Sequence, residues 1–477
     1  MRILYVSGEG APFIASGGLG DVIGALPKTV KQLHETENEV SVILPLYGQI
    51  SQAMRERMSY VTSFEMEYSW RRSYCGIFEA MVDGVKYYFV DNEQYFKRSG
   101  GLYGQPDDAE RFAFFSMAVI EFMLRTGNVP DILHANDWQT AMTVVYLRTK
   151  YADNDALRGV KSVYTIHNIE YQGKFDPYIL GDVFALDDSY KSILEYDGCL
   201  NLMKGAIVCA DRVTTVSPNY ANELRHAFFA FGLQDIVNMY AYKMSGIING
   251  IDTVYFSPDK GGDIDMSFDL ATVQEGKAHN KMALQKELGL PIDANIPMIV
   301  MITRLTHTKG IDLVLHIFEE LMQEQVQFVI LGTGDSAYEQ IFTSLSERHP
   351  QKCRALIKFD RVLSKKMYAS ADIFLMPSKS EPCGLAQMIA CSYGTIPVVR
   401  AVGGLYDTIK PFGTDASNGF LFNNFNAHEM LFKIKDAIHL YYGARPEWDE
   451  LVKRAMLTDF TWKNSAEMYL QLYQNLL

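Results

Sequence analysis

Short apolar segments with strand character alternate with longer helix-like segments along almost the whole chain, and this alternation constrains the fold most. Strands separated by helices are typical of βαβ units, which build mainly parallel sheets with helices on both faces. The pattern predicts an α/β fold with two doubly wound domains. Ten segments are predicted as strands: residues 2–7, 39–45, 131–134, 162–165, 213–216, 297–303, 326–331, 355–358, 373–376 and 396–399.

The domain borders follow from length and from one stretch rich in Gly, Asn, Asp and Pro. The chain has 477 residues, more than one hydrophobic core usually supports. The stretch GIINGIDTVYFSPDKGGD separates the two halves. We expect an N-terminal domain over 1–245, a linker over 246–262, a second domain over 263–457 and a C-terminal helix over 458–477. An apolar stripe predicts that this helix packs back on the N-terminal domain.

Charge and cysteine usage narrow the classes of partner and compartment. The net charge of −13 repels phosphate backbones and anionic lipids, which disfavours nucleic acid and membrane partners. The six cysteines lack CxxC pairs and zinc-finger spacing, so free thiols in a reducing cytoplasm and no metal site are expected. The N-terminus lacks the long apolar core of a secretory signal. No apolar run approaches the roughly 18 residues that span a bilayer.

Polar residues and glycines in the first half directly follow predicted strands. Asp137 and His167 each follow one strand, and the turn with Gly17 and Gly18 leads into a helix that carries Asp21. The carboxyl ends of parallel strands face the crevice where ligands bind, so these residues are candidates for one site. Each also has a structural reading. Asp137 would cap a helix, a lone histidine is more often structural, and the glycines would form a tight turn.

The second half repeats this placement with cations and a carboxylate. Arg304 and Lys309 follow a predicted strand, and two cations at that position neutralise a diphosphate, stabilising the charge that grows on a leaving group. Glu381 follows another strand and precedes a helix, where it would hold sugar hydroxyls or serve only as an N-terminal helix charge. Gly403 and Gly404 fit either a turn or a phosphate approach. Together these residues predict a nucleotide-sugar transferase.

Two other interpretations remain open from the residues alone. A metal-dependent transferase would use a DxD string, and the chain has two, at residues 153–155 and 263–265. Both lie in polar connectors away from the strand ends, and the cations at 304 and 309 offer a metal-free alternative. The second interpretation is a catalytically silent module that binds a nucleotide sugar or a glucan.

Seven motifs in fixed order carry a resemblance that covers essentially the whole chain. They are SGGLGDVIGALPK, HANDWQT, YTIHNIEYQG, GIINGID, RLTHTKGIDL, EPCGLAQ and GGLYDT. In these motifs the chain resembles bacterial glycogen synthases and plant starch synthases, which are retaining GT-B glycosyltransferases. The resemblance implies two Rossmann-like domains around an interdomain cleft and an ADP-glucose donor. It also implies transfer to the 4-hydroxyl at the non-reducing end of an α-1,4-glucan, with no protein nucleophile and no cofactor.

The resemblance also implies roles for individual residues. Arg304 and Lys309 match the cations on the donor diphosphate, and Glu381 matches the carboxylate that holds the glucose hydroxyls. His167 matches the imidazole near the transferred sugar, and Asp137 a carboxylate near the reacting centre. The remaining positions implied to bind the donor are Gly17, Gly18, Asp21, Asn168, Asn249, Phe359 (against the adenine), Cys383, Gly384, Leu385, Gly403 and Gly404.

The sequence departs from the family pattern at three places. Ala15 and Ser16 stand where the family has Lys and Thr, so one expected donor-contacting cation is missing. Val402 replaces a usual Thr, and Lys379 replaces a common Arg. The choice between ADP-glucose and UDP-glucose therefore stays open at this point, as does the oligomeric state.

Overall fold

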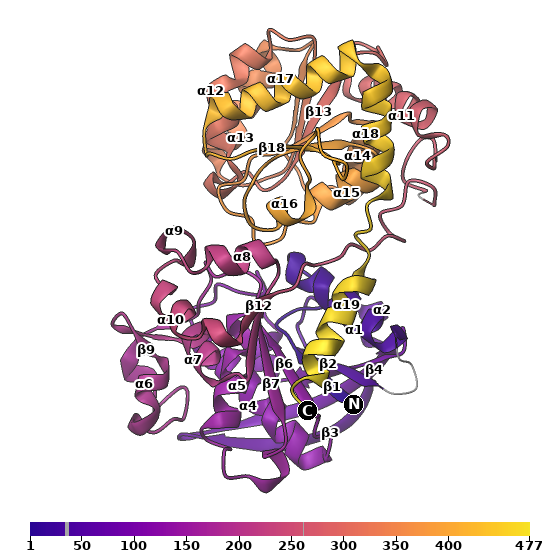
Figure 1. Ribbon diagram of the computed structural model, residues 1–477. Helices are drawn as coiled ribbons and strands as arrows, with labels where there is room; N and C mark the ends of the chain where they lie inside the picture. The colour runs from indigo at the N-terminus through magenta and orange to yellow at the C-terminus, as the bar shows by residue number, and fades with distance from the viewer. Residues whose placement is uncertain (34–37, 261) are drawn as a thin grey trace. The chain divides into compact units, whose positions relative to one another are not determined.

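The chain divides into two compact units. The computed structural model describes residues 1–33, 38–260 and 262–477 (Figure 1). Unit 1 comprises Met1–Gly250 with Trp462–Leu477, and unit 2 comprises Ile251–Thr461. The linker predicted at 246–262 is thus divided between the units, because Gly246 ends a paired strand and Ile251 pairs with Thr461. The last helix begins at Trp462, four residues later than the predicted 458.

Unit 1 is built on a nine-stranded sheet. The strands pair in parallel except at one edge, where β3, β4 and β5 are antiparallel. The parallel strands include all five predicted for this half, but the pattern missed β3, β4, β5 and β12 of this sheet. It also missed the short strands of a separate three-stranded sheet, β8 (Lys174–Phe175), β9 (Glu195–Tyr196) and β10 (Cys199–Asn201). In spatial order the strands of the nine-stranded sheet are β12 (Met244–Gly246), β11 (Arg212–Thr215), β7 (Lys161–Ile166), β6 (Ile132–Asn136), β1 (Arg2–Val6), β2 (Glu39–Pro45), β5 (Val85–Asp91), β4 (Arg71–Val82) and β3 (Ser59–Tyr68).

Helices cover this sheet in two groups. The C-terminal helix α19 (Trp462–Gln474), drawn in yellow in Figure 1, lies beside α1 (Gly18–Leu33). A second group packs in series, from α4 (Asp108–Thr126) through α5 (Ala141–Arg148) to α7 (Leu202–Cys209). Helix α4 is largely apolar and almost completely buried, as expected for a helix within a core.

A buried polar chain fixes α19 to the sheet of unit 1. His134 of β6 lies between two hydroxyl groups, with Nδ1 2.6 Å from Tyr473 Oη and Nε2 2.6 Å from Thr165 Oγ1. Tyr473 also donates to the hydroxyl of Tyr5, 3.0 Å away. Burial lowers the pKa of His134 to about 3, so the imidazole is neutral at physiological pH. The last helix is thereby tied to three strands of unit 1.

Unit 2 is a doubly wound domain with a six-stranded, all-parallel sheet. All five strands predicted for this half are present, and only β18 was missed. In spatial order the strands are β15 (Cys353–Leu356), β14 (Gln327–Leu331), β13 (Met298–Ile302), β16 (Ile373–Met376), β17 (Ile396–Arg400) and β18 (Phe420–Phe422). The main helices are α11 (Val273–Leu288), α12 (Ile311–Leu321), α13 (Ser336–Arg348), α14 (Arg361–Ser370), α17 (Ala427–Gly443) and α18 (Arg445–Leu457). No helix in the described parts of either unit is long and apolar enough to cross a membrane.

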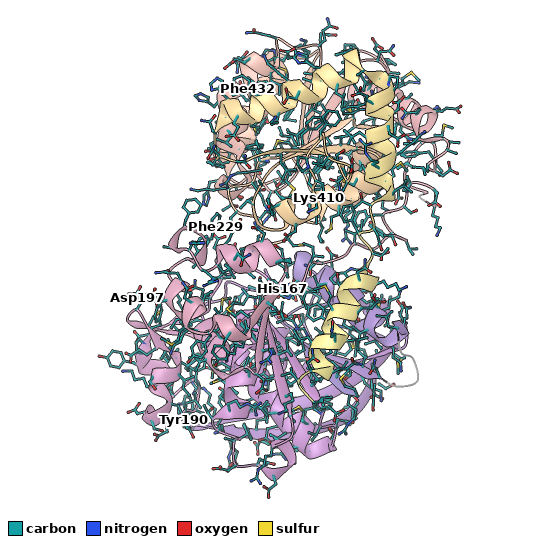
Figure 2. All side chains as sticks on the ribbon, in the orientation of Figure 1. His167, Tyr190, Asp197, Phe229, Lys410 and Phe432 are labelled. Atoms are coloured by element: carbon teal, nitrogen blue, oxygen red, sulfur yellow. The ribbon has the colours of Figure 1, made fainter. Side chains whose placement is uncertain are left out.

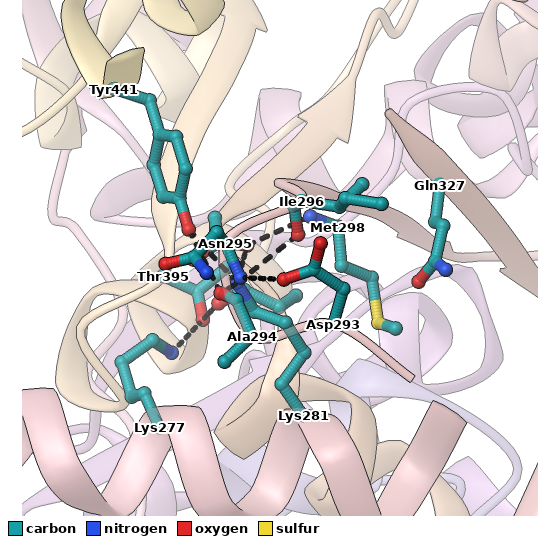
Figure 3. Close-up of polar contacts among 12 residues, drawn as sticks. Lys277, Lys281, Asp293, Ala294, Asn295, Ile296, Met298, Gln327, Thr395 and Tyr441 are labelled. Atoms are coloured by element: carbon teal, nitrogen blue, oxygen red, sulfur yellow. Dashed lines mark hydrogen bonds and ion pairs between the residues drawn. The ribbon is translucent and has the colours of Figure 1, made fainter. Parts of the chain in front are cut away.

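Two buried lysines of α11 anchor that helix to the sheet of unit 2 (Figure 3). Lys277 donates to Thr395 Oγ1 at 2.8 Å and to the carbonyl of Tyr393 at 3.0 Å. Lys281 forms an ion pair of 2.7 Å with Asp372, and the side chains are only 2% and 6% exposed. Asp372 also accepts the backbone N–H of Met298 at the start of β13. The ion pair therefore connects the helix to the beginnings of two neighbouring strands.

Replacing Lys281 with Met should destabilise the protein strongly. The substitution leaves the Asp372 carboxylate buried without its cation, which costs about 3–5 kcal/mol. Urea unfolding followed by circular dichroism measures the loss. Lys366→Met is the matched control, because its ion pair with Glu287 is partly exposed and should contribute less than about 1 kcal/mol. Equal unfolding free energies for the two variants would contradict the assignment.

Candidate functional site

Several of the predicted site residues follow strands and contact one another within each unit. In unit 1 the structure brings together Asp137, His167 and Asn168, which follow β6 and β7. In unit 2 it brings together Lys309, Glu381 and the Gly403–Gly404 pair, which follow β13, β16 and β17. Parallel pairing places these loops at the carboxyl edge of each sheet.

Asp137 connects the loops after β6 and β7. Its carboxylate Oδ1 accepts the backbone N–H groups of His167 at 2.7 Å and Asn168 at 3.4 Å. The helical turn that follows, η1 (Trp138–Thr140), receives no hydrogen bond from this side chain, so the helix-cap interpretation is wrong. Asp137 has φ 57° and ψ −180°, a conformation that non-glycine residues rarely adopt and that clusters at functional sites.

Burial changes the protonation of both side chains in this group. Burial raises the pKa of Asp137, the nearby Glu9 adds to the rise and the two amide hydrogen bonds oppose it, so that the resulting pKa is about 7. Burial lowers the pKa of His167 to about 3. At neutral pH the imidazole is therefore uncharged, while the carboxyl group is close to its midpoint. Such shifts at strand ends are typical of sites that bind or transform ligands.

The glycine turn before α1 is fixed by hydrogen bonds to Glu9 and has open space next to Gly17 and Gly18. The buried carboxylate of Glu9 accepts the backbone N–H groups of Ser16 at 2.7 Å and Gly20 at 3.1 Å. A Cβ atom added to Gly17 or Gly18 would meet no atom within 4 Å beyond the adjoining residues, among those described. The turn thus has a fixed backbone with room for a ligand at the start of a helix, where N–H groups favour anions.

The other polar positions predicted in unit 1 are placed as follows. Asp21 lies in the first turn of α1. Asn168 accepts the backbone N–H of Glu170 at 3.0 Å and so shapes its own loop. Asn249 is buried, and its Oδ1 has no hydrogen-bond partner among the described residues. A buried amide oxygen without a partner is costly, so this atom is a candidate for a ligand or water contact.

The centre of the group in unit 2 is an ion pair between Lys309 and Glu381. Lys309 lies in the turn η6 (His307–Lys309), and its Nζ is 2.5 Å from Glu381 Oε2. The side chains are 17% and 8% exposed. Ser378 Oγ donates to the same carboxylate oxygen at 3.0 Å. The following helix, α15 (Ala386–Ser392), begins five residues after Glu381, so the reading as a simple helix-terminal charge is wrong.

Gly403 and Gly404 support the loop that carries Glu381. A Cβ atom at Gly403 would lie 1.9 Å from the carbonyl oxygen of Glu381, and one at Gly404 would lie 2.2 Å from that of Cys383. The N–H of Gly404 donates to the carbonyl of Glu381 at 3.1 Å. The pair begins α16 (Gly403–Thr408). These glycines are therefore required for close backbone packing, whatever their contact with a ligand.

The remaining predicted residues of unit 2 differ in exposure. Arg304 is exposed, and its guanidinium makes no ion pair or hydrogen bond with any described residue. Phe359 follows β15 and is 85% exposed. Cys383 is buried, Gly384 has φ +70°, and Leu385 is half-buried. The unpaired guanidinium of Arg304 is suited to bind a phosphate. The exposed ring of Phe359 is suited to stack on a planar base.

The two DxD strings lie elsewhere and have carboxylates in ion pairs. Asp155 contacts Arg158 at 2.7 Å, and Asp263 contacts Lys365 at 2.7 Å.

The sequence analysis did not identify two residues that shape the group in unit 1. One is Glu9, whose carboxylate accepts N–H groups of the glycine turn, and the other is Asn136, whose Oδ1 is 2.9 Å from Nε2 of His167. His167 is labelled in Figure 2. Asn136 ends β6, Glu9 lies three residues after the end of β1, and only these positions could have suggested them.

Comparison with known proteins gives one consistent result over the full chain. The family of starch synthase catalytic domains matches residues 2–239, and glycosyl transferases group 1 matches residues 287–454. A glycogen synthase of Bacillus cereus (strain Q1) is 46% identical over 481 aligned positions, covering all of both chains. A glycogen synthase of Clostridium botulinum (strain Eklund 17B / Type B) is also 46% identical, covering all of this chain and 99% of the relative.

Two solved structures extend the likeness to the fold. The catalytic domain of Starch Synthase IV from Arabidopsis thaliana, bound to ADP and acarbose, superposes with a TM-score of 0.89 at 33% identity, covering 100% of this chain and 99% of that one. Sucrose-phosphate synthase from Thermosynechococcus elongatus gives a TM-score of 0.61 at 18% identity over 100% and 98%. The second likeness concerns the fold alone.

Alanine substitutions in the two glycine pairs should have different effects on the free energy of unfolding. Gly403→Ala introduces a Cβ atom against the Glu381 carbonyl at a positive φ of 45°, so we expect a loss of about 2 kcal/mol or more in unfolding free energy. Gly17→Ala enters open space and should change stability by less than about 0.5 kcal/mol. Urea unfolding measures both, and a Gly403→Ala variant as stable as Gly17→Ala would refute the packing role.

The raised pKa of Asp137 predicts a pH-dependent difference between the wild type and Asp137→Asn. Folding raises this pKa from 3.8 to about 7, so its contribution is fully present below pH 3.8 and is lost as pH rises through 7. The variant should therefore gain stability relative to the wild type between pH 4 and pH 8, by up to about 4 kcal/mol. Urea unfolding of both proteins across this pH range shows whether the stability of the variant rises relative to that of the wild type. A constant difference would show that the carboxyl group does not titrate as described.

Proposed function

The chain belongs to the glycogen synthase and starch synthase family of GT-B glycosyltransferases, and from this premise we propose that it is an ADP-glucose-dependent glycogen synthase. It transfers glucose to the 4-hydroxyl at the non-reducing end of an α-1,4-glucan and retains the anomeric configuration. The observation that carries the proposal is the largely buried ion pair of Lys309 and Glu381, with the exposed cation Arg304 in the same segment after β13 as Lys309.

The atoms that Lys309 and Glu381 leave unused fit a nucleotide-sugar donor. Glu381 Oε2 is occupied by Lys309 and Ser378, whereas Oε1 makes no hydrogen bond with any described residue. A carboxylate oxygen held in this way accepts hydrogen bonds from sugar hydroxyls. Lys309 has three donor hydrogens, so it can keep its hydrogen bond to Glu381 and donate another to a phosphate oxygen. Arg304 adds a fork-shaped donor that suits phosphate oxygens.

The reaction expels ADP, so its barrier depends on charge at the leaving phosphate. Arg304 and Lys309 stabilise this charge as the glycosidic bond breaks. The departing phosphate oxygen takes the proton of the acceptor hydroxyl, which attacks from the same face. Unit 2 binds the donor, and unit 1 supplies Asp137 and His167 near the transferred sugar.

The other residues that match the family pattern also contact the donor. Phe359 packs against the adenine, and the glycine turn at Gly17 and Gly18 approaches the donor from unit 1. The further donor contacts are Asp21, Asn168, Asn249, Cys383, Gly384, Leu385, Gly403 and Gly404. Six free cysteines support a reducing compartment, and we assign the enzyme to the cytoplasm, with glycogen or a maltooligosaccharide as its acceptor.

Purified protein should incorporate radioactive glucose from ADP-glucose into glycogen. Parallel reactions with UDP-glucose measure donor choice, which Ala15 leaves open, and reactions with EDTA should proceed at an unchanged rate. Glu381→Gln should lower kcat by about 100-fold or more, because a preorganised group at the reacting sugar is altered.

Glu319→Gln is the matched control on the surface of unit 2, where Glu319 is 59% exposed; it should retain full activity. Donor binding without any turnover by the wild type would favour the silent binding module. Loss of activity in EDTA, restored by a divalent metal, would favour a metal-dependent transferase.

A further inference from the structure

The imidazole of His167 is held by a neighbour whose own orientation is fixed. Asn136 is the last residue of β6 and is 2% exposed. Its Nδ2 donates to the backbone carbonyls of Val6 and His134, each at 3.2 Å. Its Oδ1 is 2.9 Å from Nε2 of His167. The side-chain amide therefore has defined contacts on both of its ends.

These contacts decide which way the amide points. Rotation by 180° would bring Oδ1 against two carbonyl oxygens and would leave Nδ2 facing His167. Two oxygen acceptors repel each other at that distance, and the buried carbonyls of Val6 and His134 would lose a donor. The oxygen of Asn136 must therefore face the ring of His167.

The orientation of Asn136 in turn decides the tautomer of His167. Because Oδ1 only accepts hydrogen bonds, Nε2 has to carry the proton, and a neutral ring then has a lone pair on Nδ1. Nδ1 makes no hydrogen bond with any residue in the described parts of the chain. The side chain is only half-buried. One nitrogen is thus fixed as a donor inside the protein, and the other is left as an open acceptor.

We propose that Asn136 is a positioning residue that holds His167 in the Nε2–H tautomer, so that Nδ1 accepts a hydrogen bond from a hydroxyl group of the transferred sugar. This inference rests on the proposed function. It makes the histidine a neutral acceptor rather than an acid or a cation near the sugar. A sugar hydroxyl that donates to Nδ1 is fixed in direction, which orients the ring for transfer.

The groups around His167 are consistent with a neutral ring. Asp137 accepts the backbone N–H of His167 rather than a ring N–H. His134, on the same strand as Asn136, is buried and neutral. Tyr220 of helix α8 (Pro218–Glu223) accepts the backbone N–H of Ile169, and Glu9 contributes through Asp137. No carboxylate in the described residues contacts the imidazole itself.

Nitrogen NMR of the wild type tests the tautomer directly. The protein has ten histidines, and His167→Gln identifies the signals of His167 in a sample labelled with 15N-histidine. At pH 7 we expect Nε2 to carry hydrogen and Nδ1 to have the shift of an unprotonated nitrogen. A protonated Nδ1, in either the other neutral tautomer or the cation, would overturn the proposal without any change to Asn136.

Two variants of Asn136 test whether this residue sets the tautomer of His167. Asn136→Asp places a carboxylate opposite Nε2, which favours the imidazolium, so the His167 signals should titrate at a higher pH than in the wild type. Because only the neutral ring accepts at Nδ1, kcat of this variant should rise with pH through that titration. Asn136→Ala removes the acceptor, so both tautomers should appear, and kcat should fall about tenfold or more while the affinity for ADP is kept.

Controls separate this effect from misfolding and from other titrations. Asn128→Asp adds the same charge to an exposed loop of unit 1 and should leave kcat and the His167 signals unchanged. Following the His167 signals by NMR beside kcat separates this titration from that of the neighbouring Asp137, whose pKa is raised to about 7. If Asn136→Asp fails to fold, the Asn136→Ala variant and the wild-type spectrum still decide the question.

The outcomes distinguish this inference from the proposed function. Absence of glucose transfer by the wild type refutes the proposed function, whatever the tautomer. Transfer by the wild type with unchanged His167 signals and unchanged kcat in both Asn136 variants refutes the positioning role alone. Transfer, an Nε2–H tautomer and the expected shift in Asn136→Asp support both.

Discussion

Parallel strand pairing is the constraint on which the candidate site depends. In unit 1, Asn136 of β6 pairs with Thr165 of β7, and the N–H of Asp137 continues the ladder to the carbonyl of Thr165 at 3.0 Å. This register brings the two following loops together, so that Asp137 meets the backbone of His167. In unit 2, the pairing of β13 with β16 similarly brings the loops of Lys309 and Glu381 within reach. Side chains distant in sequence become neighbours because their strands are neighbours.

The alternating pattern predicted ten of the strands that pair in parallel, because each is a short apolar run followed by a helix. It missed β12 and β18, which have three residues each, and β5, which pairs in parallel with β2 but antiparallel with β4. It missed β3 and β4, since these strands are antiparallel, are joined by a tight turn and expose one face to solvent, so they lack the continuous apolar run of a buried strand. The border between the two units, after Gly250, lies within the predicted linker. Residues after Gly246 look like a linker in composition, but the pairing of Ile251 with Thr461 depends on a segment more than two hundred positions away, which composition does not reveal.

The candidate residues were predictable as positions at strand ends, but their partners were not. Lys309 and Glu381 are 72 positions apart, and both were expected to face a ligand independently. Their ion pair depends on how closely two loops approach. The N–H of Lys379 donates to the carbonyl of Thr308 at 2.8 Å and joins the two loops, while Gly403 and Gly404 pack against the loop of Glu381. Local sequence indicated only that these glycines permit a turn. Asn136 was overlooked for the same reason, because its importance lies in contacts to Val6 and His134 across the sheet.

In each group, a neighbouring side chain leaves one atom of a candidate residue for the proposed ligand. His167 and Glu381 each have two hydrogen-bonding atoms, and one of the two is already occupied: Asn136 contacts Nε2 of His167, and Lys309 contacts Oε2 of Glu381. The remaining atom, Nδ1 or Oε1, is then fixed in position and in hydrogen-bonding character before a ligand arrives. Such preorganisation lowers the cost of orienting a polar, rotatable sugar. The proposed anionic donor is compatible with a net charge of −13, because Lys309 and Arg304 would contact it directly, whereas the field of distant surface carboxylates is screened by salt.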